Sequence, residues 1–204
     1  MRVPSRLLAT GITFSLSCLA QRHEIGLTLG AISGTERNGD MGSLNFGTGT
    51  ALQANYGYRF WQNGRIALFS EIHLLANPQR QIESRTATAT RDVASLFITP
   101  GLRVKFMPKR HFSPYLAVGG GYATFQQSLT TLDALPNGAP RDLHRGVLDF
   151  GGGADFRVFK SLALRAEFRD FYTGSPAFNI ATPGGQHNLV AGGGFVLKFG
   201  SSQD

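Results

Sequence analysis

One stretch decides the fold: Asn188-Leu-Val-Ala-Gly-Gly-Gly-Phe-Val-Leu-Lys-Phe199. Its residues fall alternately on two faces. One face is apolar and ends in an aromatic ring, and it carries Leu189, Ala191, Gly193, Phe195, Leu197 and Phe199. The other face is small and ends in a charge, and it carries Asn188, Val190, Gly192, Gly194, Val196 and Lys198. This alternation predicts a strand that faces lipid on one side and a tight polar lumen on the other.

The same two-faced pattern recurs in earlier segments of the chain. Together the predicted strands cover about residues 24–31, 50–60, 65–74, 93–106, 114–125, 147–158, 162–172 and 188–199. Most are near the roughly 9–11 residues that cross a bilayer when a strand is tilted. Pro100 interrupts its segment, because proline has no amide hydrogen to give to a ladder, and it predicts a bulge there.

The connections between these segments alternate between long and short. The short connection at Gln62-Asn63-Gly64 is a tight hairpin signal. Outer-membrane barrels combine long outer loops with short periplasmic turns, and a closed barrel leaves no unpaired strand edge in lipid. The sequence therefore predicts an all-β fold, an eight-stranded antiparallel up-and-down transmembrane β-barrel with short periplasmic turns and long extracellular loops.

Length and hydropathy agree with a single exported domain. The chain has 204 residues, and its mean hydropathy of −0.08 argues against a helical membrane protein. Its start has the pattern of an export signal, with a charged beginning, an apolar run and small residues before Gln21. We expect a signal peptide over residues 1–20 and an outer-membrane β-barrel domain over residues 21–204. A lipoprotein in which Cys18 is acylated is the alternative.

The chain is basic, with a formal net charge of +7. Its basic residues are scattered and mixed with acids, and an exported chain leaves the cytoplasm, so we expect no nucleic-acid partner. Solvated loop arginines are the simplest interpretation of the excess. Affinity for an anionic surface, such as lipopolysaccharide phosphates, is the alternative.

Three segments carry a resemblance to a known family: Phe112-Ser-Pro-Tyr-Leu-Ala-Val-Gly-Gly-Gly-Tyr122, Leu162-Ala-Leu-Arg-Ala-Glu-Phe-Arg-Asp170 and the terminal Phe199. With them the chain resembles the outer-membrane-protein β-barrel family, the small eight-stranded barrels akin to the membrane domain of OmpA. The resemblance covers residues 24–199 and implies the architecture rather than an activity, because such barrels include anchoring proteins, adhesins and narrow pores. It also implies that Phe199 is a terminal insertion signal for the barrel-insertion machinery.

The predicted lumen carries ionisable groups of both signs. The acids are Glu24, Glu71, Asp149, Asp155 and Glu167, and the bases are Arg59, Arg103, Lys105, Arg157, Arg165, Arg169 and Lys198. Side chains alone can fill an eight-stranded barrel, and charges buried there must pair. We predict a salt-bridged, largely closed lumen whose charge network is centred on Arg103, Asp155, Arg165 and Glu167. A narrow gated pore is the alternative.

The sequence gives little support for a catalytic or metal site. His111-Phe112-Ser113 is similar to the His-x-Ser element of lipid A deacylase barrels, but it lies in a predicted periplasmic turn without an evident partnering carboxylate. The other histidines have no metal-ligand spacing. We expect no catalytic residue, no cofactor and no metal. A soluble lipocalin-like ligand binder stays open, although aromatic residues at the short-turn ends of the strands argue against it.

These observations predict a non-enzymatic outer-membrane protein with a structural or interaction role, such as membrane integrity, adhesion or loop-mediated recognition. We expect a monomer whose partners are outer-membrane lipids, lipopolysaccharide and the insertion machinery. The loops are the expected contact surface for any extracellular ligand.

Overall fold

The computed structural model describes residues 22–39, 42–86, 88–174, 176, 178–179 and 184–200, whose regular structure is entirely β-strand. The predicted signal peptide, with Cys18, lies outside these residues. Nowhere in the described ranges is there a helix long and apolar enough to cross a membrane.

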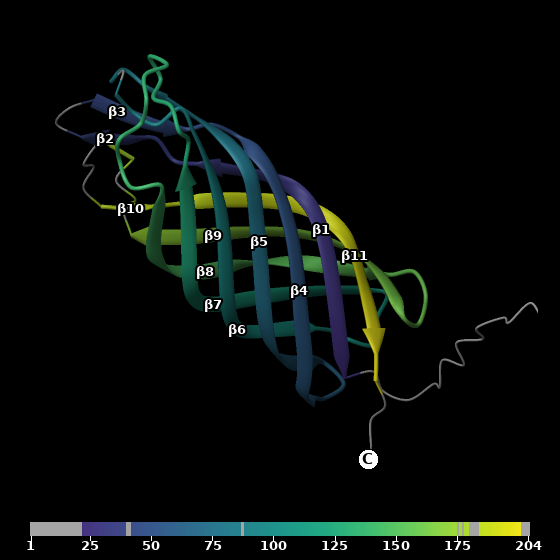
Figure 1. The fold of residues 1–204 in the computed structure, drawn as a ribbon. Coiled ribbons are helices and arrows are strands. Elements are labelled where there is room, and N and C mark those ends of the chain that lie inside the picture. Colours follow the sequence, from purple (N-terminus) through teal and green to yellow (C-terminus); the bar gives the residue numbers. More distant parts are fainter. Residues whose placement is uncertain are drawn as a thin grey trace, which may run out of the picture.

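Long antiparallel strands form a closed barrel (Figure 1). They are β1 (His23–Gly34), β4 (Gly49–Gln62), β5 (Ile66–Ser84), β6 (Asp92–Phe106), β7 (Phe112–Gln127), β8 (Asp142–Arg157), β9 (Leu162–Gly174) and β11 (Asn188–Phe199). Each pairs with the next long strand along the chain. β1 also pairs with β11, with His23 opposite Phe199 and Gly34 opposite Asn188, so the sheet closes on itself. The predicted eight-stranded up-and-down barrel is confirmed.

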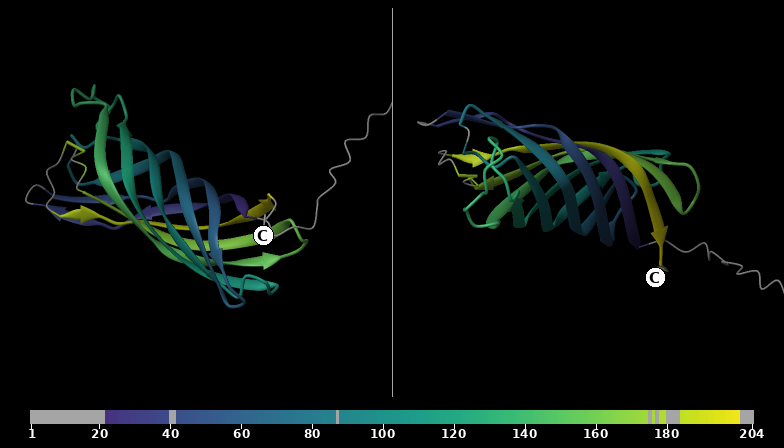
Figure 2. Two further views of the ribbon diagram at one scale, coloured as in Figure 1. Left: turned by 90° about the horizontal axis from the view of Figure 1, so that it is seen from below. Right: turned by 45° about the horizontal axis from the view of Figure 1, so that its top comes forward.

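The connections alternate as predicted. Short turns at residues 63–65, 107–111 and 158–161 lie at one end of the barrel, which we call the short-turn end. The opposite end, the long-loop end, carries three additional short strands: β2 (Arg37–Gly39), β3 (Gly42–Phe46) and β10 (Gly185–Gln186). β3 pairs with β2 and β5, and β10 pairs with β9, so the long connections extend the sheet beyond the barrel (Figure 2).

Several strands continue past their predicted ends on the long-loop side. β5 runs on to Ser84, through residues that the sequence assigns to a polar loop, and β8 begins at Asp142 instead of residue 147. Apolar alternation is the signal by which a strand is recognised in a sequence. These extensions lie beyond the lipid-facing part of the barrel, where that signal ends.

The bulge predicted at Pro100 is wrong. The register of β6 against β5 is continuous through Ile72 opposite Pro100. Against β7 it is the same on both sides of the proline, with an interruption only between Ile98 and Gly101. The missing amide hydrogen therefore faces one neighbouring strand and interrupts one ladder locally, without an extra residue.

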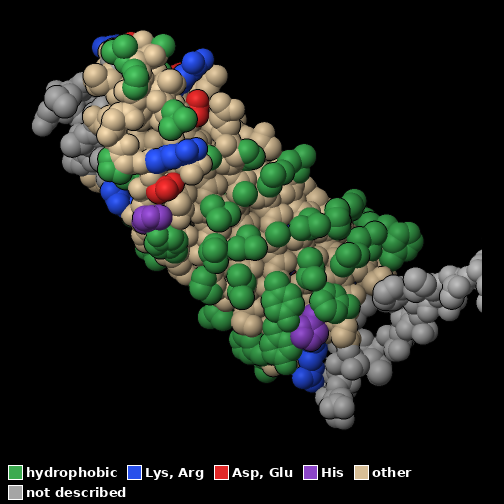
Figure 3. All heavy atoms as spheres, viewed as in Figure 1, with side chains coloured by type: hydrophobic (Ala, Val, Ile, Leu, Met, Phe, Trp, Pro, Cys, Tyr) green, Lys and Arg blue, Asp and Glu red, His purple; other side chains and the backbone are tan. Residues whose placement is uncertain are grey.

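Exposed large apolar side chains from all eight long strands form an apolar belt on the outside of the barrel, and Figure 3 shows one face of it. Leu29, Leu116 and Leu148 are 60%, 61% and 60% exposed, and other large apolar side chains on the outward faces are similarly exposed. A soluble protein rarely leaves so large a contiguous apolar surface in water. The belt therefore faces lipid, and the lipocalin-like alternative, which would bury this face, is wrong.

Candidate functional site

A charge network fills the half of the lumen nearer the short-turn end. It consists of Glu24, Glu71, Arg103, Lys105, Asp149, Asp155, Arg165, Glu167 and Arg169. None of these side chains belongs to a residue more than 5% exposed. They converge because alternate residues of β1, β5, β6, β8 and β9 point into the barrel.

The lower part of the network is built around two carboxylates, Glu24 and Asp155. Glu24 lies 2.8 Å from Arg103 and 2.7 Å from Lys105. Lys105 also lies 2.7 Å from Asp155. Arg165 donates two hydrogen bonds to Asp155, at 2.7 and 3.0 Å, so its planar fork holds both carboxylate oxygens.

The upper part of the network is built around one guanidinium, that of Arg169. It contacts Glu71, lies 2.8 Å from Asp149 and lies 3.4 Å from Glu167. Arg103 joins the two parts, because its Nε is 3.1 Å from Glu71 while its Nη2 reaches Glu24. The nine residues thus form one continuous set of ion pairs.

Neutral hydroxyl groups satisfy further carboxylate oxygens. Tyr115 and Thr28 each donate a hydrogen bond to Glu167 at 2.8 Å. Thr99 donates to Asp149 at 2.9 Å. No role was predicted for these hydroxyl groups, although Thr28 and Thr99 lie on the lumen-facing side of their predicted strands. They stabilise the ionised carboxylates, because a buried charge needs hydrogen bonds as well as a counter-ion.

The four residues predicted to be the centre all lie in the network, where Glu24 lies 2.8 Å from Arg103 and 3.9 Å from Arg165 and so links these two. Arg165 pairs with Asp155. Among the ion pairs of the described residues, Arg103 connects to Asp155 through Glu24 and Lys105, while Glu167 pairs with Arg169.

Three predicted lumen bases, Arg59, Arg157 and Lys198, lie outside the network, and Lys198 stands opposite Glu24 in the pairing of β1 with β11. Arg59 donates to Gln62 at 2.5 Å, and Arg157 donates to the carbonyl oxygen of Lys109 at 2.9 Å. The side chains of Arg59 and Arg157 therefore hold the short-turn end instead of filling the lumen.

An apolar plug fills the half of the interior nearer the long-loop end. It consists of Ile32, Leu44, Phe46, Ala51, Leu75, Ile82, Ala89, Val93, Phe97, Ala123, Phe125, Val147, Phe171, Phe178 and Val190. Phe97 packs against Phe125 and Phe171, with ring centroids 5.6 and 5.4 Å apart. Phe178, from the connection before β10, packs against Phe46 at 5.4 Å and against Phe125 at 5.8 Å. A residue of a long loop thus completes the plug.

The ion pairs therefore lie mainly in one half of the lumen, and the apolar plug in the other half was not predicted from the sequence. A signal was present, because Phe97 lies two residues before Thr99 on the predicted lumen face. One cation, Arg80, lies against the plug. It is 1% exposed, donates to Asn188 at 3.1 Å and stacks on Phe46 at 5.1 Å. Burial lowers the pKa of Arg80 to about 10, which keeps it protonated at neutral pH.

The two side chains of the His-x-Ser element contact different backbone carbonyl oxygens in the described part of the chain. Ser113 is 3% exposed and donates to the carbonyl oxygen of Met107 at 2.9 Å. The His111 Nδ1 lies 3.3 Å from the carbonyl oxygen of Arg157. The hydrogen bonds of the described residues thus engage the two side chains separately. Within the same residues, no group of three or more His, Cys, Asp or Glu side chains is arranged to hold a metal ion.

Comparison with known proteins identifies the architecture. No protein-family model and no curated protein matches the sequence. The solved structure of OprG from Pseudomonas aeruginosa is similar, with a TM-score of 0.56 and 14% identity over 90% of this chain and 98% of that one. Neisserial surface protein A gives 0.54 and 15% over 87% and 97%, and the outer membrane protein AlkL gives 0.51 and 13% over 100% and 99%. The chain is therefore a small eight-stranded β-barrel with the fold of the outer-membrane barrels, and this fold and its apolar belt place it in the outer membrane.

Proposed function

We propose that this protein is a non-enzymatic outer-membrane barrel that acts through its structure and its extracellular surface, in membrane integrity, adhesion or loop-mediated recognition. One observation carries the proposal: the charge network fills one half of the lumen and the apolar plug fills the other half. An eight-stranded barrel filled by side chains leaves no aqueous channel.

Two different kinds of interaction oppose a gated pore. Separating the charge network would leave buried charges uncompensated, at several kcal/mol each. Displacing the plug would expose Phe97, Phe125 and Phe171, which are all fully buried, to water. Opening requires both changes together, so the closed state is the one that this sequence favours.

The long-loop end offers an ordered surface for contacts. In loop 128–141, the Leu132 amide donates to the Ala89 carbonyl at 3.0 Å, and this bond joins two long loops. The same loop presents Leu129 and Leu135, which are 67% and 59% exposed. Apolar side chains held outward on an ordered loop are typical of recognition surfaces, and they support a role in adhesion or loop-mediated recognition.

We expect the purified full-length protein to show no steady porin-like conductance in planar lipid bilayers. The reason is that both the charge network and the apolar plug must move before ions can pass through the lumen. Single-channel recording measures this, with a porin of known conductance as the positive control and heat-modifiable gel migration as proof of folding. A steady wide-open conductance from folded protein would overturn the closed-lumen proposal.

We also expect the folded protein to release no acyl chain from lipid A. Ser113 is buried and bonded to a backbone carbonyl, so it lacks an activating base. Mass spectrometry of lipid A incubated with the protein tests this. Acyl-chain release by the parent protein that disappears in Ser113→Ala would instead support the deacylase alternative.

A further inference from the structure

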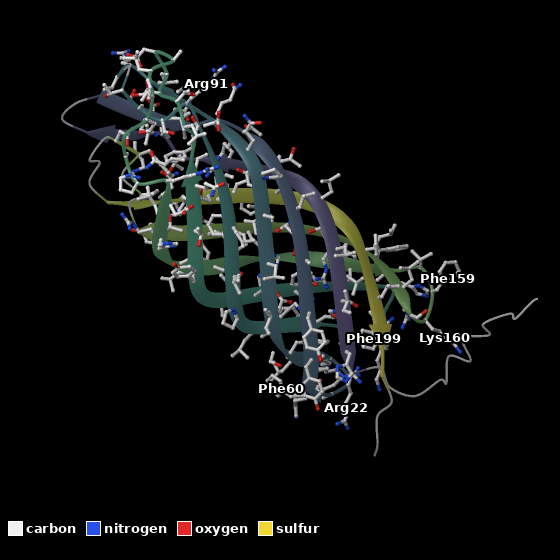
Figure 4. All side chains as sticks on the ribbon, viewed as in Figure 1. Arg22, Phe60, Arg91, Phe159, Lys160 and Phe199 are labelled. Carbon is white, nitrogen blue, oxygen red and sulfur yellow. The ribbon has the colours of Figure 1, made fainter. Side chains whose placement is uncertain are left out.

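The basic excess of the chain gathers at the short-turn end. This group, which we call the basic rim, consists of Arg22, Arg59, Arg65, Lys109, Arg110, Arg157 and Lys160. Figure 4 shows Arg22 and Lys160 at this end, and Arg91 at the opposite end. Among the residues that the structure describes, the acids nearest this end are Glu24 and Asp155, which are 4% and 1% exposed and belong to the charge network. Among the described residues, the charged groups on the outer surface of the rim are therefore cations.

The long-loop end, by contrast, mixes both signs. Its described acids are Glu36, Glu83, Asp92, Asp133, Asp142 and Asp170, and its cations are Arg37, Arg80, Arg85, Arg91, Arg141 and Arg145. On the face that Figure 3 shows, acidic and basic side chains lie together at this end. The excess positive charge, predicted to lie in solvated loops, is concentrated among the described residues at the short-turn end, which is the periplasmic end.

Exposed aromatic side chains lie beside the basic rim. Phe60, Trp61, Phe159 and Phe199 are 53%, 46%, 65% and 42% exposed, and Figure 4 shows three of them at the short-turn end. Aromatic girdles of this kind mark the membrane–water interface of a barrel. The cations of the rim consequently lie at the depth of lipid headgroups.

A pocket of about 570 Å³ opens where the rim meets the apolar belt. It is lined by Gly64, Arg65, Ile66, Phe106, Met107, Lys109 and Arg110. The apolar side comes from Ile66, which pairs with Phe106. The cationic side comes from Arg65, Lys109 and Arg110, which are all exposed.

Backbone hydrogen bonds hold the two turns that form this pocket. The Met107 amide donates to the Arg65 carbonyl at 2.6 Å, and the Arg110 amide donates to the Met107 carbonyl at 2.9 Å. From β8, Arg157 donates to the Lys109 carbonyl at 2.9 Å. The cations of the pocket therefore project from a fixed backbone, next to an apolar wall.

We propose that this pocket binds the headgroup of an anionic phospholipid in the periplasmic leaflet. The phosphodiester is held by Arg65, Lys109 and Arg110, because guanidinium and ammonium groups donate charge-assisted hydrogen bonds to phosphate oxygens. The acyl chains follow Ile66 and Phe106 along the belt. Basic residues beside an apolar surface attract anionic lipids in this way. This lipid-binding proposal does not depend on whether the lumen conducts ions.

Trp61 provides a built-in test. It is the sole tryptophan of the chain and lies at the end of β4, beside the turn that carries Gly64 and Arg65. The full-length protein is reconstituted in phosphatidylcholine vesicles that contain rising fractions of brominated phosphatidylglycerol or, separately, brominated phosphatidylcholine. Quenching of Trp61 fluorescence then reports which lipid occupies this part of the periplasmic side. We expect phosphatidylglycerol to bind about fivefold more strongly.

Matched variants decide the assignment. The triple variant Arg65→Gln/Lys109→Gln/Arg110→Gln is expected to abolish the preference, and Lys109→Gln alone, the mildest change, is expected to reduce it. Arg85→Gln/Arg91→Gln/Arg141→Gln removes the same charge from exposed positions at the long-loop end and is expected to keep the preference. Gel migration checks that each variant is folded.

Three results would overturn the proposal: equal binding of the two lipids by the parent protein, an undiminished preference in both the triple variant and Lys109→Gln, or an equal loss in the long-loop control. Excess glycerol 3-phosphate serves as a soluble competitor, and we expect it to leave the quenching unchanged. Displacement by it would assign the site to free phosphate and refute the lipid.

Discussion

Replacing Arg169 with methionine is expected to lower the free energy of unfolding by about 3–5 kcal/mol. Arg169 is 1% exposed and is paired with three buried carboxylates, those of Glu71, Asp149 and Glu167. Methionine fills much of the same space but removes the positive charge. Asp149 is affected most, because Arg169 is its ion-pair partner among the described residues and it would keep only the hydrogen bond from Thr99.

The measurement is urea-induced unfolding in detergent micelles or lipid vesicles, followed by the fluorescence of Trp61. Arg91→Met is the matched control, since Arg91 is an exposed arginine at the long-loop end, and we expect it to change stability by no more than about 0.5 kcal/mol. A loss below about 1 kcal/mol in Arg169→Met, the range of an exposed ion pair, would show that the network does not act as a buried unit.

A second substitution separates lost packing from unpaired charge. Adding Asp149→Asn to the Arg169→Met variant removes the carboxylate that is left without its cation. If unpaired charge is the main penalty, the double variant is more stable than the sum of the two single effects predicts. If the effects of the two single substitutions on the free energy of unfolding are strictly additive, the loss of stability in Arg169→Met comes from lost packing instead.

The sequence revealed the barrel because lipid imposes a constraint on every strand. Each crossing segment must alternate, so Leu27 and Leu116 identify lipid-facing positions as clearly as Glu24 and Arg103 identify the lumen. Alternating connection lengths added the up-and-down order. The extension of β5 to Ser84 was not predictable in this way, because outside the membrane no lipid enforces the alternation.

Within the lumen, the sequence supplied the face of each residue but not its partner. Glu24 lies near the start of β1 and Lys105 near the end of β6, yet they meet at 2.7 Å across the barrel interior. Their contact depends on the register and stagger of every intervening strand. The alternation of residues along a strand predicts which face a side chain occupies but gives no information about register. The apolar plug was missed for another reason: the lumen charges suggested a wholly polar interior, although Phe97 and Phe125 stand at inward positions.

Gly194, in the strand that closes the barrel, is the site of the second large effect, and we expect Gly194→Ala to destabilise the seam between β1 and β11. A Cβ atom there would overlap the carbonyl oxygen of Leu27 and lie 2.7 Å from the Thr28 Cα. Both are backbone atoms of β1, so no change of side-chain rotamer relieves the overlap, and the two strands must separate. Overpacking of this kind lowers stability by about 1–3 kcal/mol, and a backbone clash belongs at the upper end of that range.

Gly193→Ala is the matched control for this prediction. Gly193 is the preceding residue on the lipid-facing side, and a Cβ atom there would meet only the Arg165 carbonyl oxygen at 3.5 Å, an ordinary contact. We expect its urea midpoint to stay close to that of the parent protein, within about 0.5 kcal/mol of stability, while Gly194→Ala shows a lower midpoint and loses its heat-modifiable gel migration at a lower temperature. Equal midpoints for the two variants would contradict the prediction. Because the two glycines are adjacent in β11 and lie on opposite faces of the sheet, the comparison tests whether close approach of the backbones inside the lumen, and not glycine content as such, closes the barrel.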